Sequence, residues 1–234
     1  MKLIVGMLVK NEADRYLSRV IENINLFADE LVVLDDQSTD HSMDLLKSLS
    51  SIPTTIHTNY YGHFSNEIVL RKNLYAKIVE RKPDWFMVID ADEVYSGACR
   101  KAFDQLMDQS EVDVWGFRLY DLWDEQHYRA DALWQAQEYY TPMLARNIKD
   151  FEPTWRETPQ HCGRLPQNVG SLRNSGTDLM KIKHLGWVRV ADRLRKYERY
   201  MANDPEGKYG SLEQYKSILD PCPCLVRWVD LLFD

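Results

Sequence analysis

Short apolar runs that alternate with helix-like segments constrain the fold of this chain more than any other feature of its sequence. The runs LIVGMLV, LVVL and WFMVI are apolar on both faces of an extended strand, apart from one glycine. Between them, leucine, isoleucine and valine recur every three or four residues, which is the spacing of a buried helical face. Such alternation is typical of a parallel sheet with helices on both faces. We therefore predict an α/β fold with a mostly parallel central sheet.

Each apolar run is followed closely by acidic or amide side chains. They are Asn11 and Glu12 after the first run, Asp35 and Asp36 after the second, and Asp90, Asp92 and Glu93 after the third. Ligands of parallel sheets bind outside the carboxyl ends of the strands. Carboxylates gathered at such an edge repel one another unless a cation or a ligand offsets their charge. We therefore expect the binding site at this edge of the sheet.

The balance of charge excludes one class of partner. The formal net charge is −7 and the isoelectric point is near 5.4, whereas nonspecific nucleic-acid binding needs a basic face that replaces counterions. Residues 181–200 nevertheless carry seven Lys or Arg side chains against two acids. We expect no nucleic-acid partner, and a small, strongly anionic ligand near this segment.

The spacing of the cysteines and the length of the apolar runs indicate in which cellular compartment the protein is expected. The four cysteines lack the spacing of a disulfide framework or a zinc site. The opening MKLIVGMLVKNE lacks the pattern of a signal peptide, and no apolar run approaches the roughly 20 residues that span a bilayer. We expect a cytoplasmic protein without a transmembrane segment, and the alternative is peripheral association with the inner face of the membrane.

Three motifs, in this order, carry a resemblance to a known family. VKNEADRYLSRVI, ELVVLDDQSTDHS and WFMVIDADEV resemble family 2 glycosyltransferases of the GT-A fold, in particular bacterial members with an Asp-x-Asp-Glu motif. The resemblance implies one GT-A domain over residues 1–234. Its parts would be a nucleotide-sugar-binding half (1–100), a half that binds the acceptor and adds a metal-binding histidine (101–200), and a helical tail (201–234).

The resemblance also implies how the donor is held. Asp36 would receive the nucleobase, with Asn11 and Glu12 beside it. Asp90 would lie near the ribose, and Arg71 falls in a segment that lies near the donor in such enzymes.

The same resemblance implies a divalent metal. Asp92 would coordinate Mn²⁺ or Mg²⁺ together with His184, which ends a predicted late strand. Hard oxygen ligands suit these ions, and a Lewis acid stabilises the charge that grows on a leaving diphosphate. Three cations of the segment after His184 would contact that diphosphate, namely Arg189, Arg193 and Lys196.

The catalytic base is a choice among three residues. An inverting transferase needs a group that takes the proton of the acceptor hydroxyl. Related enzymes often carry a Leu-His-Glu-like segment before the late strand, and the comparable run here is WRETPQHCGRLP, with Cys162 where the glutamate would fall. Glu157 is the preferred base, and His161 and Asp124 are the alternatives.

Aromatic residues leave a further alternative open. Trp123, Trp134, Tyr139, Tyr140 and Trp155 either form a platform for an acceptor sugar or pack in the core.

The function that the resemblance implies is metal-dependent, inverting transfer of a hexose-like sugar from a nucleotide-diphosphate sugar, most simply a UDP-sugar. The acceptor would be a hydroxyl of a glycan or lipid-linked molecule in surface polysaccharide or lipopolysaccharide biosynthesis. The alternative is a noncatalytic nucleotide- or carbohydrate-binding protein with a vestigial site, which Cys162 in place of glutamate would favour. A nucleotidyltransferase is disfavoured, because GMLVKNEADR is not a glycine-rich basic loop.

Overall fold

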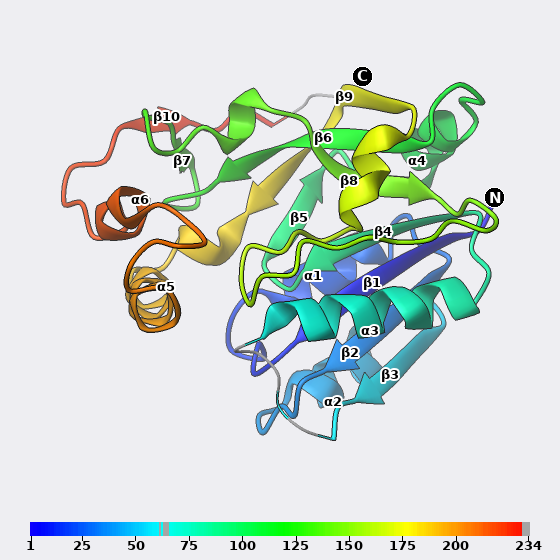
Figure 1. Cartoon of the computed structure of the whole chain (residues 1–234), viewed down its shortest axis with the longest axis horizontal. Coiled ribbons are helices and arrows are strands. Elements are labelled where there is room, and N and C mark those ends of the chain that lie inside the picture. Colours follow the sequence, from blue (N-terminus) through cyan, green and yellow to red (C-terminus); the bar gives the residue numbers. More distant parts are fainter. Residues whose placement is uncertain (61, 63–65, 231–234) are drawn as a thin grey trace.

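The sheet begins as the sequence predicts, with parallel strands joined by helices (Figure 1). The computed structural model describes residues 1–60, 62 and 66–230. Its first four strands lie in the order β3-β2-β1-β4 and are β1 (Leu3–Val9), β2 (Glu30–Asp35), β3 (Thr54–Thr58) and β4 (Trp85–Asp90). Pairing places Val9 opposite Asp35 and Leu8 opposite Asp90. The acidic ends of β2 and β4 therefore flank the end of β1 at one edge.

Beyond β4 the sheet becomes mixed. It continues in the order β8-β6-β9-β5, with β5 (Glu93–Ser96), β6 (Val114–Asp121), β8 (Thr141–Arg146) and β9 (Asn174–His184). β8 is antiparallel to β4 and β6, β9 is parallel to β6, and β5 is antiparallel to β9. The register places Glu93 opposite His184. This pairing brings a residue from late in the chain to the acidic end of β4.

Both faces of the parallel half are covered, because β1 alternates its side chains between two cores. Leu3, Val5 and Met7 pack with three helices, α1 (Leu17–Ile24), α2 (Ser42–Leu49) and α4 (Arg100–Met107). Ile4 and Leu8 pack on the opposite face with α3 (Glu67–Glu80). The segment between β8 and β9 covers the rest of that second face, and Figure 1 shows it crossing in front of β4.

The C-terminal helices lie beside the carboxyl edge of the parallel strands (Figure 1). β9 leads through a 3-10 turn, η3 (Leu185–Trp187), into α5 (Val190–Asn203), which contacts α6 (Leu212–Ser217). Short turns η1 (Ala136–Glu138) and η2 (Gln167–Ser171) complete the helical elements of the described chain. Trp123, Trp134, Trp187 and Ile218 form a buried cluster that joins this region to the sheet. Two of the five aromatic residues that could have formed an acceptor platform, Trp123 and Trp134, are therefore core residues.

The predicted helical tail (201–234) is wrong at one segment. Leu225–Arg227 is not helical but forms strand β10, which pairs antiparallel with β7 (His127–Arg129) in a two-stranded sheet. Residues 231–234 of that tail lie outside the described residues. This short segment pairs with a strand that is about 100 residues earlier in the chain, and local periodicity does not reveal such a partner. Among residues 1–60, 62 and 66–230, no helix has the length and apolar character to cross a membrane.

We predict that Leu74→Ala lowers the free energy of unfolding by about 2 to 5 kcal/mol, because Leu74 is fully buried between α3 and β1 and truncation leaves a cavity. Val69→Ala on the same helix is the matched control. Val69 is 39% exposed, so its truncation should leave stability within about 0.5 kcal/mol of the native protein. Urea unfolding of both variants makes the comparison, and equal losses would contradict this packing of α3.

Candidate functional site

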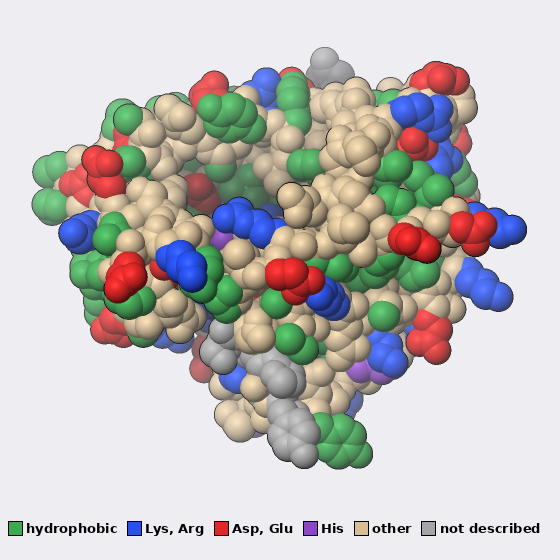
Figure 2. All heavy atoms as spheres, viewed as in Figure 1, with side chains coloured by type: hydrophobic (Ala, Val, Ile, Leu, Met, Phe, Trp, Pro, Cys, Tyr) green, Lys and Arg blue, Asp and Glu red, His purple; other side chains and the backbone are tan. Residues whose placement is uncertain are grey.

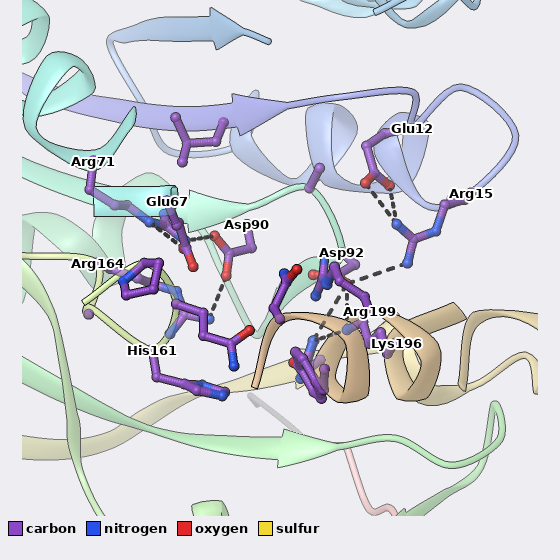
Figure 3. A pocket seen from close by; sticks show the side chains of 18 residues that line it. Glu12, Arg15, Glu67, Arg71, Asp90, Asp92, His161, Arg164, Lys196 and Arg199 are labelled. Carbon is purple, nitrogen blue, oxygen red and sulfur yellow. Dashed lines mark hydrogen bonds and ion pairs between the residues drawn. The ribbon is translucent and has the colours of Figure 1, made fainter. Parts of the chain in front are cut away.

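A cavity of about 400 Å³ lies at the carboxyl edge of β1 and β4. Its walls come from the loop after β1, the start of α3, the end of β4, the segment before η2, and α5 (Figure 3). Figure 2 shows Lys, Arg and His side chains gathered at the rim of a hollow on the face viewed. The predicted site residues that line the cavity are Glu12, Arg71, Asp90, Asp92, His161, His184 and Lys196. Lining residues that the sequence did not indicate include Arg15, Glu67, Gln160, Arg164, Tyr200 and Asn203, and also Arg199, which was counted only as part of the cationic segment.

The side chains of Asp92 and His184 lie close together, and both contact the ammonium group of Lys196. Asp92 Oδ2 lies 3.5 Å from His184 Nε2, and the ammonium of Lys196 lies 3.1 Å from each of these atoms. Burial raises the pKa of Asp92, but the charges of Lys196 and His184 outweigh it and hold that pKa well below its usual range. Asp92 is therefore ionised and already pairs with a cation.

The carboxylate of Asp121 fixes the orientation of the His184 ring. Its Nδ1 lies 2.7 Å from Asp121 Oδ1, which also accepts a hydrogen bond from Trp187 Nε1. A carboxylate bonded to one ring nitrogen is how proteins orient a histidine that uses the other nitrogen as a ligand. Burial and Lys196 lower the pKa of His184, but Asp92 and Asp121 outweigh them and raise it to about 9.

With the ring of His184 in its neutral form, the donor set at this point fits a divalent cation with oxygen and nitrogen ligands, and binding of the ion would release the second proton of the ring. One carboxylate oxygen and one imidazole nitrogen converge, and Lys196 occupies the position of positive charge between them. Within residues 1–60, 62 and 66–230, no third His, Cys, Asp or Glu completes a metal group. An ion at this point would therefore meet two side chains of the described residues, Asp92 and His184. The backbone of Gly186 closes on this point, since a Cβ there would overlap Lys196 Nζ and Asp92 Oδ2.

Asp90 belongs to a separate cluster (Figure 3). It accepts hydrogen bonds from Arg71 at 2.9 Å and from Arg164 at 2.8 Å. Burial raises the pKa of Asp90, but Arg164 and Arg71 outweigh it and hold the carboxyl ionised. Arg164 also binds Glu93, whose pKa burial raises to about 7, and Arg71 also binds Glu67. The two acids of the Asp-x-Asp motif therefore face different partners.

Glu12 and Arg15 form a third pair in the cavity wall. One guanidinium nitrogen of Arg15 lies 2.7 and 2.8 Å from the two oxygens of Glu12. Burial raises the pKa of Glu12 to about 7, although Arg15 opposes the shift. Arg15 also lies 3.2 Å from the buried Asp192 of α5, so it joins the first loop to the late helix.

Other residues predicted to bind the donor lie outside the cavity lining. Asn11 accepts a hydrogen bond from the backbone of Thr39 at 2.8 Å. Asp36 is buried, 1% exposed, and accepts hydrogen bonds from Lys10 and Asn59, each at 3.1 Å. These contacts turn Asn11 toward the loop after β2 and hold Asp36 at the start of that loop, and neither residue lines the cavity.

Arg189 and Arg193 bind backbone carbonyls rather than line the cavity. Arg189 donates to Asp14 O at 2.6 Å, and Arg193 donates to Trp123 O at 2.8 Å. The guanidinium of Arg193 also lies over the ring of Trp123. Both side chains fasten the start of α5 to the rest of the molecule.

Of the three candidate bases, His161 alone lines the cavity. Glu157 lies on the surface beside α3, with Lys72 Nζ at 2.5 Å. Asp124 accepts backbone hydrogen bonds from Gln126 and His127 in a turn. Cys162 is buried, and burial raises its thiol pKa to about 11, so it does not replace a carboxylate base at neutral pH.

Comparison with known proteins adds sequence relatives. Residues 4–164 match glycosyl transferase family 2. Uncharacterised proteins from Mycobacterium tuberculosis and Mycobacterium bovis are each 22% identical over 225 residues, which covers 88% of this chain and 52% of each relative. An uncharacterised glycosyltransferase from Rickettsia bellii is 32% identical over 96 residues, 41% of this chain and 29% of that protein. The chain thus spans about half the length of the mycobacterial relatives.

Solved structures show the same fold. S. aureus TarS matches with a TM-score of 0.57 and 17% identity over 94% of this chain and 42% of its own. TarS 1-349 in complex with UDP-GlcNAc matches with a TM-score of 0.56 and 15% identity over 94% of this chain and 70% of its own. The predicted GT-A fold is confirmed by this likeness.

We predict that Gly186→Ala destabilises the protein by about 1 to 3 kcal/mol, because the added methyl group would push apart Asp92 and Lys196 in a packed interior. Gly170→Ala is the matched control, since a Cβ at Gly170 meets no atom within 4 Å. Urea unfolding of the two variants tests the prediction. A loss for Gly186→Ala no larger than that of the control would show that the backbone does not close on the cluster.

Proposed function

The chain belongs to glycosyl transferase family 2, and from this premise we propose that it transfers a sugar from a nucleotide-diphosphate donor to an acceptor hydroxyl. The observation that carries the proposal is the pairing of Asp92 and His184 around a cation at the carboxyl edge of the sheet, inside a cavity with further guanidinium groups. An anionic donor and a metal are the complement of such a cavity.

A UDP-sugar is the proposed donor. TarS 1-349, which shares the fold, was solved in complex with UDP-GlcNAc. In this chain the diphosphate would meet Lys196, Arg199 and Arg15, which line the cavity. Asp90, held ionised by two guanidinium groups, would accept the ribose hydroxyl. Asp36, which follows β2 outside the cavity lining, would accept the nucleobase in exchange for Lys10 or Asn59, its present partners. Residues 1–100 would then form the donor-binding half, and residues 101–200 the acceptor-binding half.

Asp92 and His184 would hold Mn²⁺ or Mg²⁺. The ion supplies Lewis-acid stabilisation of the departing diphosphate. Lys196, which bonds Asp92 and lines the cavity, would bind the phosphate oxygens of the donor. Asp121 would keep the ring of His184 in place throughout.

His161 is the proposed base. It lines the cavity, and burial, opposed by Glu67 and Asp204, lowers its pKa below the usual value. The imidazole is therefore neutral at pH 7 and able to take a proton from an attacking hydroxyl, as inversion at the anomeric carbon requires. We propose a hydroxyl of a glycan or lipid-linked acceptor in surface polysaccharide or lipopolysaccharide biosynthesis, in keeping with the family resemblance. The cytoplasm or the inner face of the membrane is the proposed location.

The second candidate function is noncatalytic binding. It is favoured by one observation, the inert Cys162 at the place of the family glutamate. A binder would hold UDP or UDP-sugar without releasing product, so turnover distinguishes the two functions.

Donor binding is tested by thermal unfolding with UDP, Mn²⁺, both together, and both with chelator. We predict that UDP at about 100 times its dissociation constant stabilises the protein by about 2.7 kcal/mol, and only with the metal present. Asp92→Asn should abolish the metal-dependent part. Asp44→Asn, at an exposed acid on α2, should keep it. Stabilisation that ignores the metal would overturn the role of Asp92, and no stabilisation by any nucleotide would overturn the donor assignment.

The base is tested by UDP release from a panel of UDP-sugars with glycan acceptors. We predict that His161→Gln lowers kcat by about 10²- to 10⁴-fold with UDP binding unchanged. Glu157→Gln should leave kcat unchanged, because Glu157 lies outside the cavity. The reverse result would assign the base to Glu157, and UDP binding without turnover of any sugar would favour the noncatalytic binder.

A further inference from the structure

A chain of hydrogen bonds leads from the cavity into the C-terminal part of the molecule. His161 Nε2 lies 2.9 Å from the hydroxyl of Tyr215 in α6, and that hydroxyl lies 3.0 Å from Asp204 Oδ2 at the end of α5. Tyr215 and Asp204 are each 2% exposed. The three residues come from separate segments of the chain, and no local sequence pattern indicates that they meet.

Asp204 fixes the direction of this chain of bonds. Its carboxylate accepts backbone N–H groups from three successive residues, Lys208 at 2.6 Å, Tyr209 at 3.0 Å and Gly210 at 3.0 Å. Burial raises the pKa of Asp204, but these amides and the Tyr215 hydroxyl outweigh it and keep the carboxyl ionised. An ionised carboxylate only accepts, so Tyr215 must donate its hydrogen to Asp204.

The same logic sets the proton on His161. Tyr215 donates its only hydroxyl hydrogen to Asp204, so its oxygen can only accept a hydrogen bond from other groups. His161 Nε2, which lies 2.9 Å from this oxygen, must therefore carry a hydrogen. Gln160 Nε2 donates to the same oxygen at 3.4 Å, which satisfies its remaining lone pair. Nδ1 of His161 makes no hydrogen bond within the described chain, so it is the ring nitrogen left to accept a proton.

Packing around the three residues leaves little freedom for another arrangement. The rings of His161 and Tyr215 are nearly parallel at 6.0 Å, and the ring of Tyr200 lies 5.4 Å from His161 and 5.0 Å from Tyr215. A Cβ at Gly210 would overlap the Tyr215 hydroxyl. His161 itself has a φ of 55°, in the left-handed region that costs energy for a residue with a side chain. The surrounding residues therefore hold His161 in a backbone conformation that is unfavourable for a residue with a side chain.

We propose that Tyr215 and Asp204 are positioning residues that fix His161 in the Nε2–H tautomer, so that Nδ1 is the nitrogen that accepts the proton of the attacking hydroxyl. The proposal rests on the proposed function of His161 as the base. It assigns a role in the reaction to the segment after α5, which lies beyond the residues that match the family. The arrangement has the logic of a serine protease triad, in which a carboxylate sets the tautomer of the histidine.

The charged groups that face His161 come from several elements. Glu67 of α3 and Asp204 raise its pKa, while Arg156 of the loop and Arg199 of α5 lower it together with burial, which is the largest effect. The net shift is downward. The acidic limb of the pH profile of kcat/KM, which reports the free enzyme, should therefore lie below the usual value for a histidine.

The first experiment measures the tautomer by ¹⁵N NMR of the histidine side chains in the full chain, with His161→Gln used to assign the signal. We expect His161 as the Nε2–H tautomer at pH 7. An Nδ1–H tautomer in the native protein would overturn the proposal without reference to activity.

The second experiment compares two variants that each lose one tyrosine hydroxyl. Tyr215→Phe should allow both tautomers in the NMR spectrum and lower kcat by about 10- to 100-fold, with KM for the UDP-sugar unchanged. Tyr197→Phe is the control, because Tyr197 packs against the tryptophan cluster and its hydroxyl makes no hydrogen bond within the described chain. We expect its tautomer signal and kcat to match the native protein.

Two results would separate the possible failures. If Tyr215→Phe changes the tautomer but leaves kcat unchanged while His161→Gln lowers it, the positioning role is overturned and the base remains. If His161→Gln also leaves kcat unchanged, the proposed base is overturned and the positioning proposal falls with it. Should Tyr215→Phe fail to fold, Gly210→Ala gives the same test by displacing the hydroxyl, and the tautomer of the native protein decides independently.

Discussion

The structure depends on cations that offset three carboxylates at the end of β4. Asp90, Asp92 and Glu93 lie within four positions; Asp92 and Glu93 are buried, and the side chain of Asp90 is 29% exposed. Mutual repulsion and lost hydration would oppose this arrangement without nearby cations. Arg71, Arg164 and Lys196 supply the compensation from α3, the segment before η2, and α5. The ion pairs of Arg164 and Lys196 attach the second half of the chain to the first, and all three cations line the cavity.

The parallel half and its acidic edge could be predicted from the sequence because both follow from local patterns. Apolar runs define β1, β2 and β4, and the residues after each run must fall at the same edge. β5 and β8 could not be found in this way, because both depend on antiparallel partners elsewhere in the chain. Arg164 and Arg15 carried no local signal either, since their importance lies in partners that the fold brings near.

The cationic helix shows the limit of reasoning from composition. Residues 181–200 are rich in positive charge, which suggested an anionic ligand, yet only some of these side chains face the cavity. Lys196 and Arg199 do so, whereas Arg189 and Arg193 bind carbonyl groups near the start of α5. Composition identified a segment that does reach the cavity. Helical geometry then decides which of its cations line the cavity and which bind backbone carbonyls. The candidate bases also differ in position, because Glu157 was preferred from the sequence, whereas His161 alone of the three lines the cavity.

The pairing of Asp92 with Lys196 has a consequence for how the chain matures during synthesis. The two residues are 104 positions apart, so at about 5 to 20 residues per second the ribosome delivers the ammonium roughly 5 to 20 seconds after the carboxylate. Until then the carboxylates at the end of β4 must stay hydrated, and the first four strands lack the later strands of the sheet. The final consolidation of this protein is therefore a late event, set by translation as much as by the intrinsic rate of folding.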